Sequence, residues 1–194
     1  MAVRGPGGRA RRPRVGRGLR GRAAPAPNDP ASLAGAREQA IRMLSRRDYA
    51  KRELAGRLAE RGFAAEAAAG AVEVLEDERL VNDARYVESA VASRIARGQG
   101  PRRIALDLER LGVDQQLVAQ AVDARSPEWT RRALELRERR FGRAAPKDQR
   151  ERSRQVRFLL YRGYTPEHVR VALGRDARDL EDVDLEEPEA GARD

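Results

Sequence analysis

The sequence predicts an all-α protein built from three tandem three-helix repeats that form an elongated, curved array, with disordered charged tails. Three observations support this fold class. A block of fifteen residues recurs about every fifty positions along the chain. Apolar residues fall at helical spacing, and no segment shows the sustained alternation that a half-buried strand requires. The two ends of the chain are strongly charged and poor in large apolar residues, which is typical of disordered segments.

The repeated block contains a helix end and a helix start. Its three copies are LAERGFAAEAAAGAV (58–72), LERLGVDQQLVAQAV (108–122) and LLYRGYTPEHVRVAL (159–173). When they are aligned on Gly62, Gly112 and Gly163, each has a leucine four residues before the glycine and a bulky residue directly after it. Glycine adopts the left-handed conformation that ends a helix, and the next residue then folds back onto that helix. Each copy is therefore predicted to be a helix, a glycine corner and a second helix.

A further helix is predicted upstream of each block, over residues 36–46, 84–97 and 128–140, which gives three helices per unit. The helix-start signals agree with this division. They are Gly100-Pro101, Asp114, Thr165-Pro166 and the capping box Asp148-x-x-Glu151. The predicted boundaries are a tail over 1–32, units over 33–80, 81–125 and 126–175, and an acidic tail over 176–194. Because alanine is prominent in each interior, single units are expected to depend on their neighbours for stability.

Charge is distributed unevenly along the 194 residues, whose net charge is +9. Residues 1–22 hold eight arginines and no acid, whereas residues 179–194 hold eight acids and one arginine. The body between these tails carries its own excess of positive charge, which points to a polyanionic partner such as nucleic acid or a protein assembled on it. The acidic tail is expected to compete with phosphates for the basic surface. Deletion of residues 179–194 is then predicted to raise the affinity for DNA or for a protein filament assembled on it.

The sequence offers little for catalysis, metals or cofactors, so we expect none of the three. There is no cysteine, and the single histidine, His168, is expected to be a solvated residue near a helix start. Carboxylates in residues 75–83 are expected to solvate one helix end and to cap the next helix through Asn82 or Asp83. No apolar stretch approaches the ~20 residues that span a bilayer, and no signal peptide is indicated, so a cytoplasmic protein without membrane contact is expected. Trp129, Phe158 and Tyr161 are predicted to be core residues and not base-stacking platforms.

Basic residues gather where the second helix of each unit begins, and these are the candidate contacts for a partner. The candidates are Arg46, Arg47, Lys51, Arg52, Arg94, Arg97, Arg102, Arg103, Arg150 and Arg154. Arg131, Arg132, Arg137, Arg139, Arg140 and Arg152 add to the basic character of the third unit. Two interpretations stay open at this point. One is a solvated surface in which arginines pair with glutamates four residues away. The other is a basic stripe that recurs once per unit and follows a periodic polyanion.

Three stretches of the chain resemble the RecX family of regulators of the RecA recombinase. They are AIRMLSRRDYAKRELAGRLAERGF, LEDERLVNDARYVESAVASRIARGQGPRRIALDLERLGV and RFLLYRGYTPEHVRVAL, within residues 36–174. The middle stretch is the most specific, with the L-x-N-D turn from Leu80, the Arg85-Tyr86 pair and the G-x-G-P-R-R-I run from Gly98. The chain departs from the family at Ala50, where a capping serine is common. It departs again at Gly70, which is expected to interrupt a helix, and at Gln155, which occupies the place of Leu54 and Ile104.

The resemblance implies a non-enzymatic protein that lies along the groove of a RecA–single-stranded DNA filament. Family members hinder filament growth and so restrain ATP hydrolysis, strand exchange and coprotease activity, which connects them to homologous recombination, DNA repair and the SOS response. The expected partners are the RecA filament and, as a secondary contact, single-stranded DNA, with the protein acting as a monomer. Two alternatives remain: a stand-alone DNA- or RNA-binding helical protein, and a helical adaptor for another assembly.

Overall fold

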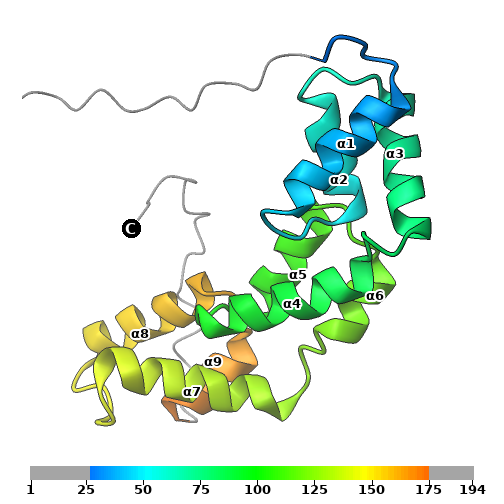
Figure 1. Cartoon of the computed structure of the whole chain (residues 1–194). Coiled ribbons are helices and arrows are strands. Elements are labelled where there is room, and N and C mark those ends of the chain that lie inside the picture. The colour runs from blue at the N-terminus through cyan, green and yellow to red at the C-terminus, as the bar shows by residue number, and fades with distance from the viewer. Residues whose placement is uncertain (1–26, 175–194) are drawn as a thin grey trace, which may run out of the picture.

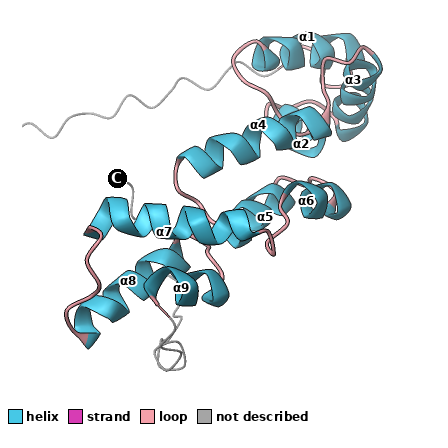
Figure 2. Cartoon of the chain, turned by 90° about the horizontal axis from the view of Figure 1, so that it is seen from below, coloured by secondary structure: helices cyan, strands magenta, loops and turns pink. Residues whose placement is uncertain are grey.

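The computed structural model describes residues 27–174, and helices are the only regular secondary structure in that range (Figure 2). In chain order they are α1 (Leu33–Leu44), α2 (Lys51–Ala59), α3 (Ala65–Asp77), α4 (Asp83–Ala96), α5 (Pro101–Arg110), α6 (Gln115–Ala121), α7 (Pro127–Phe141), α8 (Gln149–Tyr161) and α9 (Pro166–Leu173). In each consecutive group of three, the first helix packs against the third. We call these groups unit 1 (α1–α3), unit 2 (α4–α6) and unit 3 (α7–α9).

The three units follow one another in a bent row (Figure 1). Unit 1 and unit 3 lie at opposite ends, and unit 2 connects them. This arrangement confirms the predicted all-α fold of tandem three-helix repeats in an elongated, curved array. The predicted acidic tail over 176–194 and residues 1–26 of the predicted first tail lie outside the described residues. The rest of the first tail, residues 27–32, leads into α1, where Ser32 accepts from the N–H of Gly35 as the helix cap.

The glycine corners are where the repeat pattern placed them. Gly62, Gly112 and Gly163 have φ values of 96°, 79° and 90°, so each is in the left-handed region and ends the second helix of its unit. The residue after each glycine donates its N–H to the carbonyl of the leucine four residues before the glycine, at 3.1–3.2 Å. The leucine and the bulky residue seen in the sequence are therefore the two ends of a helix-terminating hydrogen bond.

Most of the predicted helix starts are confirmed. Asp114 caps α6 by accepting from two backbone N–H groups, and Thr165 accepts from the N–H of His168 before Pro166. Asp148 accepts from the N–H of Glu151 at 2.7 Å, as a capping box requires. The carboxylate of Glu151, however, accepts from the N–H of Lys147 at 3.0 Å. This contact satisfies the N–H one residue before Asp148.

The starts of α2 and α5 are completed by the next unit along the chain. Ala50 and Gly100 occupy their N-cap positions, and neither supplies a side-chain hydrogen bond. At α2, the carboxylate of Asp83 from unit 2 accepts from the N–H of Lys51 at 2.8 Å. At α5, the carbonyl groups of Arg162 and Gly163 from unit 3 accept from backbone N–H groups at 2.7 and 3.0 Å. Helix α8, which no fourth unit follows in the described residues, has its own cap in Asp148. The side-chain cap that Ala50 cannot supply is thus replaced from across the unit boundary.

Buried apolar side chains form two clusters. One comprises Ala36, Leu54, Leu58, Leu75 and their neighbours within unit 1, and it ends at Val81. The other extends continuously through units 2 and 3, from Tyr86 to Leu173, and also includes Ala50 from the start of α2. Units 2 and 3 therefore share one core, whereas unit 1 has a separate core that contacts the shared one at its edge.

Unit 3 contains a buried polar pair where the other units are apolar. Gln155 is fully buried in α8, and its side-chain carbonyl accepts from Nε of Arg137 at 3.0 Å. The remaining guanidinium nitrogens of Arg137 donate to the carbonyl groups of Arg143 and Ala144. Arg137 was grouped with the basic surface of unit 3, and that placement is wrong because its side chain is buried. The departure of Gln155 from the leucine pattern is explained by its partner.

Three further expectations are corrected by the structure. His168 is buried and not solvated, because its ring lies between the start of α9 and the α6–α7 loop, with Nε2 3.0 Å from the carbonyl of Ala124. Gly70 does not interrupt α3, which continues through it, and the side chain of Leu33 packs where Gly70 has no side chain. Tyr161 is not a core residue, because half of it is exposed on α8. Trp129 is buried as predicted and donates its indole N–H to the carbonyl of Asp123.

Candidate functional site

The ten candidate residues lie where the second helix of each unit begins. Arg46 and Arg47 are in the α1–α2 loop, and Lys51 and Arg52 form the first turn of α2. The equivalent positions in unit 2 are the end of α4, with Arg94 and Arg97, and the first turn of α5, with Arg102 and Arg103. In unit 3 the candidates Arg150 and Arg154 are both exposed on α8.

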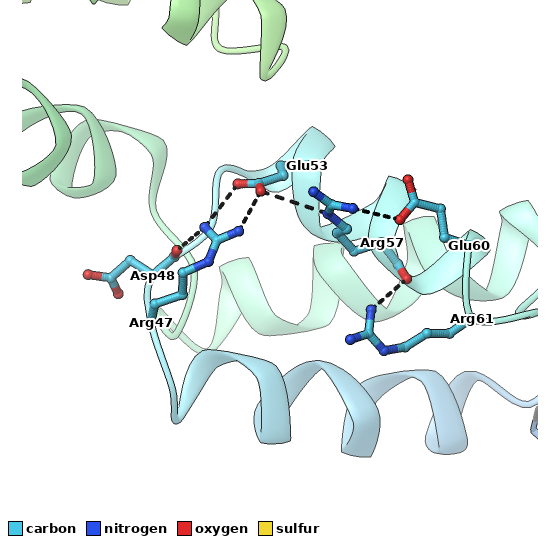
Figure 3. Close-up of polar contacts among 6 residues, drawn as sticks. All are labelled: Arg47, Asp48, Glu53, Arg57, Glu60 and Arg61. Carbon is cyan, nitrogen blue, oxygen red and sulfur yellow. Dashed lines mark hydrogen bonds and ion pairs between the residues drawn. The ribbon is translucent and has the colours of Figure 1, made fainter. Parts of the chain in front are cut away.

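In unit 1 the positive charge is largely compensated within the unit. Arg47 holds the Glu53 carboxylate at 2.6 Å and stacks its guanidinium 3.6 Å from the ring centroid of Tyr49. Glu53 also lies 4.0 Å from Arg57, which in turn pairs with Glu60 at 2.8 Å (Figure 3). The hydrogen bond to Glu53 raises the pKa of Arg47, and that to Glu60 raises the pKa of Arg57. For these residues the interpretation as a paired, solvated surface is the better one.

Two other candidates also have carboxylate partners. Lys51 pairs with Glu76 at 2.8 Å, and this hydrogen bond raises the pKa of the Lys51 ammonium group. Arg94 is half-buried, with its Nε 3.9 Å from Asp107 and a second contact to the carbonyl of Ala90. Both side chains hold helices together, and their charge is partly neutralised before any partner arrives.

The remaining candidates have no carboxylate partner within the described part of the chain. They are Arg46, Arg52, Arg97, Arg102, Arg103, Arg150 and Arg154. Two of them mark the junctions between units, because Arg52 lies against Gly112 of unit 2 and Arg103 against Gly163 of unit 3. Uncompensated guanidinium groups are thus present in all three units.

One surface hollow lies between α2 and the α5–α6 corner. We call it the first hollow; its volume is about 450 Å³, and it is lined by Arg52, Glu53, Gly56, Arg57, Glu60, Glu109, Arg110, Leu111 and Gly112. Three arginines and three glutamates face one another there. The charges balance, so this hollow has no preference for an anion.

The second hollow lies between the end of α4 and helices α7 and α8. We call it the arginine hollow; its volume is about 350 Å³, and it is lined by Ala96, Arg97, Leu136, Arg139, Arg140, Phe158 and Arg162. Four of these seven residues are arginines, and no described acidic residue lines the hollow. A concave surface with one sign of charge concentrates counter-ions of the opposite sign.

Aromatic rings support several of these arginines in place of carboxylates. Phe141 and Phe158 meet edge to face, with ring centroids 5.3 Å apart. The guanidinium of Arg162 lies 5.4 Å from the Phe158 ring, and those of Arg140 and Arg154 lie 6.0 and 5.6 Å from Phe141. An aromatic face orients a guanidinium group without cancelling its charge. These arginines are therefore held in place and remain available to an anion.

Of the residues that line the arginine hollow, only Arg97 is among the ten candidates predicted from the sequence. Arg139 and Arg140 were recognised as basic but were not selected, and Arg162 was missed. A signal for Arg162 was present, because residues 152–166 contain four arginines and no acidic residue. Its spacing of four from Phe158 also places the two side chains on one helix face.

Within residues 27–174 we find no group of three or more histidine or acidic side chains arranged to hold a metal ion. No helix in the same range is long and apolar enough to cross a membrane. The fold and the candidate site define the class as a helical repeat protein whose most distinctive surface is a row of guanidinium groups at the unit junctions.

Comparison with known proteins identifies the family. Sequence models of the first, second and third three-helix domains of RecX match residues 36–75, 82–122 and 128–173. A regulatory protein RecX from Halorhodospira halophila is 41% identical over 136 residues, which cover 70% of this chain and 84% of that protein. A second, from Chromohalobacter salexigens, is 42% identical over 137 residues, which cover 71% of this chain and 90% of that protein. The chain belongs to the RecX family of regulatory proteins.

Solved structures agree on the fold. The crystal structure of RecX from Lactobacillus salivarius superposes with a TM-score of 0.61 at 19% identity, over 72% of this chain and 93% of that one. Another crystal structure of a regulatory protein RecX gives a TM-score of 0.59 at 20% identity, over 70% and 68% of the two chains.

Proposed function

We propose that this protein is a non-enzymatic regulator, mainly an inhibitor, of RecA that acts in the regulation of DNA repair. It binds as a cytoplasmic monomer along the groove of the RecA–single-stranded DNA filament and limits filament growth, ATP hydrolysis, strand exchange and coprotease activity. Membership of a family of proteins named for regulation supports the class of function. The observation that carries the proposal is the bent row of three similar units with uncompensated arginines in each.

A repeating array suits a repeating partner. A filament presents the same acidic and phosphate-lined surface at every subunit, so similar units with a similar basic surface can engage successive positions. Each single contact is weak because exposed ion pairs in water contribute about 0–1 kcal/mol. Several contacts on one chain add through effective concentration, which gives tight binding to a filament and weak binding to a lone subunit.

The test is a titration of the protein into preformed RecA filaments on single-stranded DNA while DNA-dependent ATP hydrolysis is recorded. We expect ATP hydrolysis to be suppressed at molar ratios well below one protein per RecA subunit, because a protein that bridges subunits affects more than one of them. Co-sedimentation of the protein with the filaments measures binding in the same samples. Unchanged hydrolysis together with no co-sedimentation would exclude this function.

The second candidate is a stand-alone nucleic-acid-binding protein, and the acid-free arginine hollow is the observation that favours it. The two candidates differ in their behaviour on bare DNA at about 0.15 M salt. Tight binding without RecA supports the second candidate, because phosphate contacts would then suffice. Binding that disappears above low salt leaves DNA as an auxiliary contact of a filament regulator.

A further inference from the structure

We infer that the arginine hollow and the neighbouring Tyr161 form a binding site for single-stranded nucleic acid, with phosphates in the hollow and one base stacked on the tyrosine ring. This binding site rests on the proposed function, because the target proposed there, the RecA filament, contains single-stranded DNA. It assigns the nucleic-acid contact to the junction between units 2 and 3.

The charge of the hollow selects an anion. Arg139 and Arg140 extend from the last turn of α7 and are exposed, and neither has a carboxylate partner in the described range. Arg162 is oriented by the Phe158 ring and by a hydrogen bond of 3.1 Å to the carbonyl of Arg97. The Arg97 side chain is in turn bound to Ser93. Arg97 and Arg162 are thus held by hydrogen bonds, Arg140 is oriented by the Phe141 ring, and Arg139 is exposed on α7, an arrangement that suits the forked recognition of phosphate oxygens.

The position of the hollow makes it a rigid site. It lies where α4 of unit 2 meets α7 and α8 of unit 3, and these units share one hydrophobic core. Leu136 on its floor is buried and packs against Gly98 at the end of α4. Because both walls belong to the same packed body, little ordering is required when a ligand binds.

Tyr161 is the feature that distinguishes a single strand from other polyanions. It is 50% exposed, so much of its ring is accessible from solvent. It lies three residues after Phe158, so the two side chains are neighbours on the surface of α8 and Tyr161 stands beside a residue that lines the hollow. The guanidinium of Arg103 lies 5.5 Å from its ring centroid. An exposed ring beside arginines stacks on an unpaired base, whereas the bases of a duplex are already stacked on each other and an acidic peptide has no base to offer.

The test uses the full chain and a fluorescently labelled thirty-nucleotide oligo-dT, with affinity measured by anisotropy over a range of salt concentrations. R139Q/R140Q removes two phosphate contacts, so the slope of log affinity against log salt is expected to fall by about 1.4. The matched control is R131Q/R143Q, which removes the same charge from exposed residues that pair with glutamates outside the hollow. The control is expected to keep at least the greater part of the wild-type slope and affinity.

The tyrosine gives an independent readout. Y161A is expected to lower the affinity about tenfold with an unchanged salt slope, because stacking carries no charge. Y161F keeps the ring and is expected to bind as the wild type does. Circular dichroism verifies that each variant remains helical.

Two outcomes would overturn the inference. In the first, the hollow and control variants lose the same slope, so only total charge matters. In the second, the hollow variant keeps its affinity for the oligonucleotide but no longer inhibits RecA, which assigns the hollow to an acidic protein surface. Wild-type inhibition of RecA is measured in parallel, so failure of the DNA site is distinguished from failure of the proposed function.

Discussion

The two junctions between units are built on the same repeat but differ in how they hold together and in what they leave exposed. Between units 1 and 2, the contacts run through side chains: the Asp83 carboxylate caps α2, and Arg52 lies over Gly112. Between units 2 and 3, backbone meets backbone, since Gly100 approaches Gly163 and its N–H donates to the carbonyl of Arg162. The apolar core is continuous across the second junction and separate at the first.

Because of this difference, the contacts that stabilise the second junction are not the side chains that are available for binding. The second junction is held by apolar contacts and backbone hydrogen bonds, so the arginines above it are not required as structural ion pairs and stay available. At the first junction, Arg57 pairs with Glu60, and the three glutamates of α2 and α5 that line the first hollow balance the charge of its three arginines. We therefore expect unit 1 to move relative to a rigid body made of units 2 and 3, and nucleic acid to contact that rigid body.

The largest expected effect comes from adding a methyl group at the corner of unit 3. In Gly163→Ala the new Cβ would lie 2.4 Å from Cβ and 2.6 Å from the backbone nitrogen of Arg103, so the junction must open. We expect the free energy of unfolding to fall by about 3–5 kcal/mol, from backbone strain and overpacking together. Urea unfolding followed by circular dichroism measures it.

Two other glycines with positive φ are the comparison for this variant. Gly142 has φ 88° with open space around it, so Gly142→Ala reports strain alone, about 1–2 kcal/mol. In Gly112→Ala the new Cβ would lie 2.2 Å from Cδ and 2.8 Å from Cβ of Arg52, which are side-chain atoms and not backbone, so an intermediate loss is expected. Equal losses at all three positions would mean that the second junction is no tighter than the first.

A second effect concerns the polar pair inside unit 3. Gln155→Leu restores the apolar pattern of Leu54 and Ile104 but deprives buried Arg137 of an acceptor. We expect a loss of about 1–3 kcal/mol in the free energy of unfolding, because a buried N–H of a charged group left without an acceptor outweighs the added apolar contact. The double variant R137M/Q155L removes both partners and is expected to recover most of the loss. Stabilisation by Gln155→Leu alone would show that Arg137 finds water or another acceptor.

A smaller effect is expected when the side-chain contact that caps α2 at the first junction is removed. Asp83→Ala removes the acceptor of the Lys51 N–H and is expected to destabilise the start of α2 by about 1 kcal/mol. Amide hydrogen exchange at Lys51 reports this directly and is expected to accelerate, while amides in the core of units 2 and 3 keep their protection. Asp83→Asn keeps an acceptor oxygen and serves as the control. Unchanged exchange at Lys51 in the alanine variant would show that α2 is capped by other means.

The smallest effect is the pH dependence of the second junction. Burial lowers the pKa of His168, whose Nδ1 accepts from the Thr165 N–H while Nε2 donates to the carbonyl of Ala124. The unfolded chain therefore binds the proton more readily than the folded one. The contribution of His168 to stability is complete above about pH 6.5 and decreases as the pH falls below it.

His168 is the single histidine of the chain, so no other histidine contributes to the pH dependence in this range. Thermal unfolding at pH 7.5 and 5.5 measures the decrease, and His168→Gln is expected to abolish most of it. A wild-type unfolding temperature that is the same at both pH values would show that the ring is already hydrated in the folded protein.

Much of the fold could be predicted from the sequence because its signals are local. A glycine flanked by a leucine and a bulky residue determines a helix end through neighbours in the chain, and the three corners were found in this way. The burial of Gln155 and His168 could not be predicted, since it depends on contacts with residues 18 and 44 positions away. The exposure of Tyr161 could not be predicted either, since it depends on which distant residues fail to cover its ring. The same applies to the arginines, because whether a guanidinium group is neutralised depends on which carboxylates the fold brings near it.

The most direct test of the central claim is the potency of the R139Q/R140Q variant against preformed RecA filaments, compared with that of R131Q/R143Q at about 0.15 M salt. The account predicts that the hollow variant needs about tenfold more protein to halve ATP hydrolysis, because two charge-assisted contacts are lost. The control variant, with the same net charge, is predicted to act at nearly the wild-type concentration. Equal potency of the two variants would contradict the assignment of the functional surface to the junction between units 2 and 3.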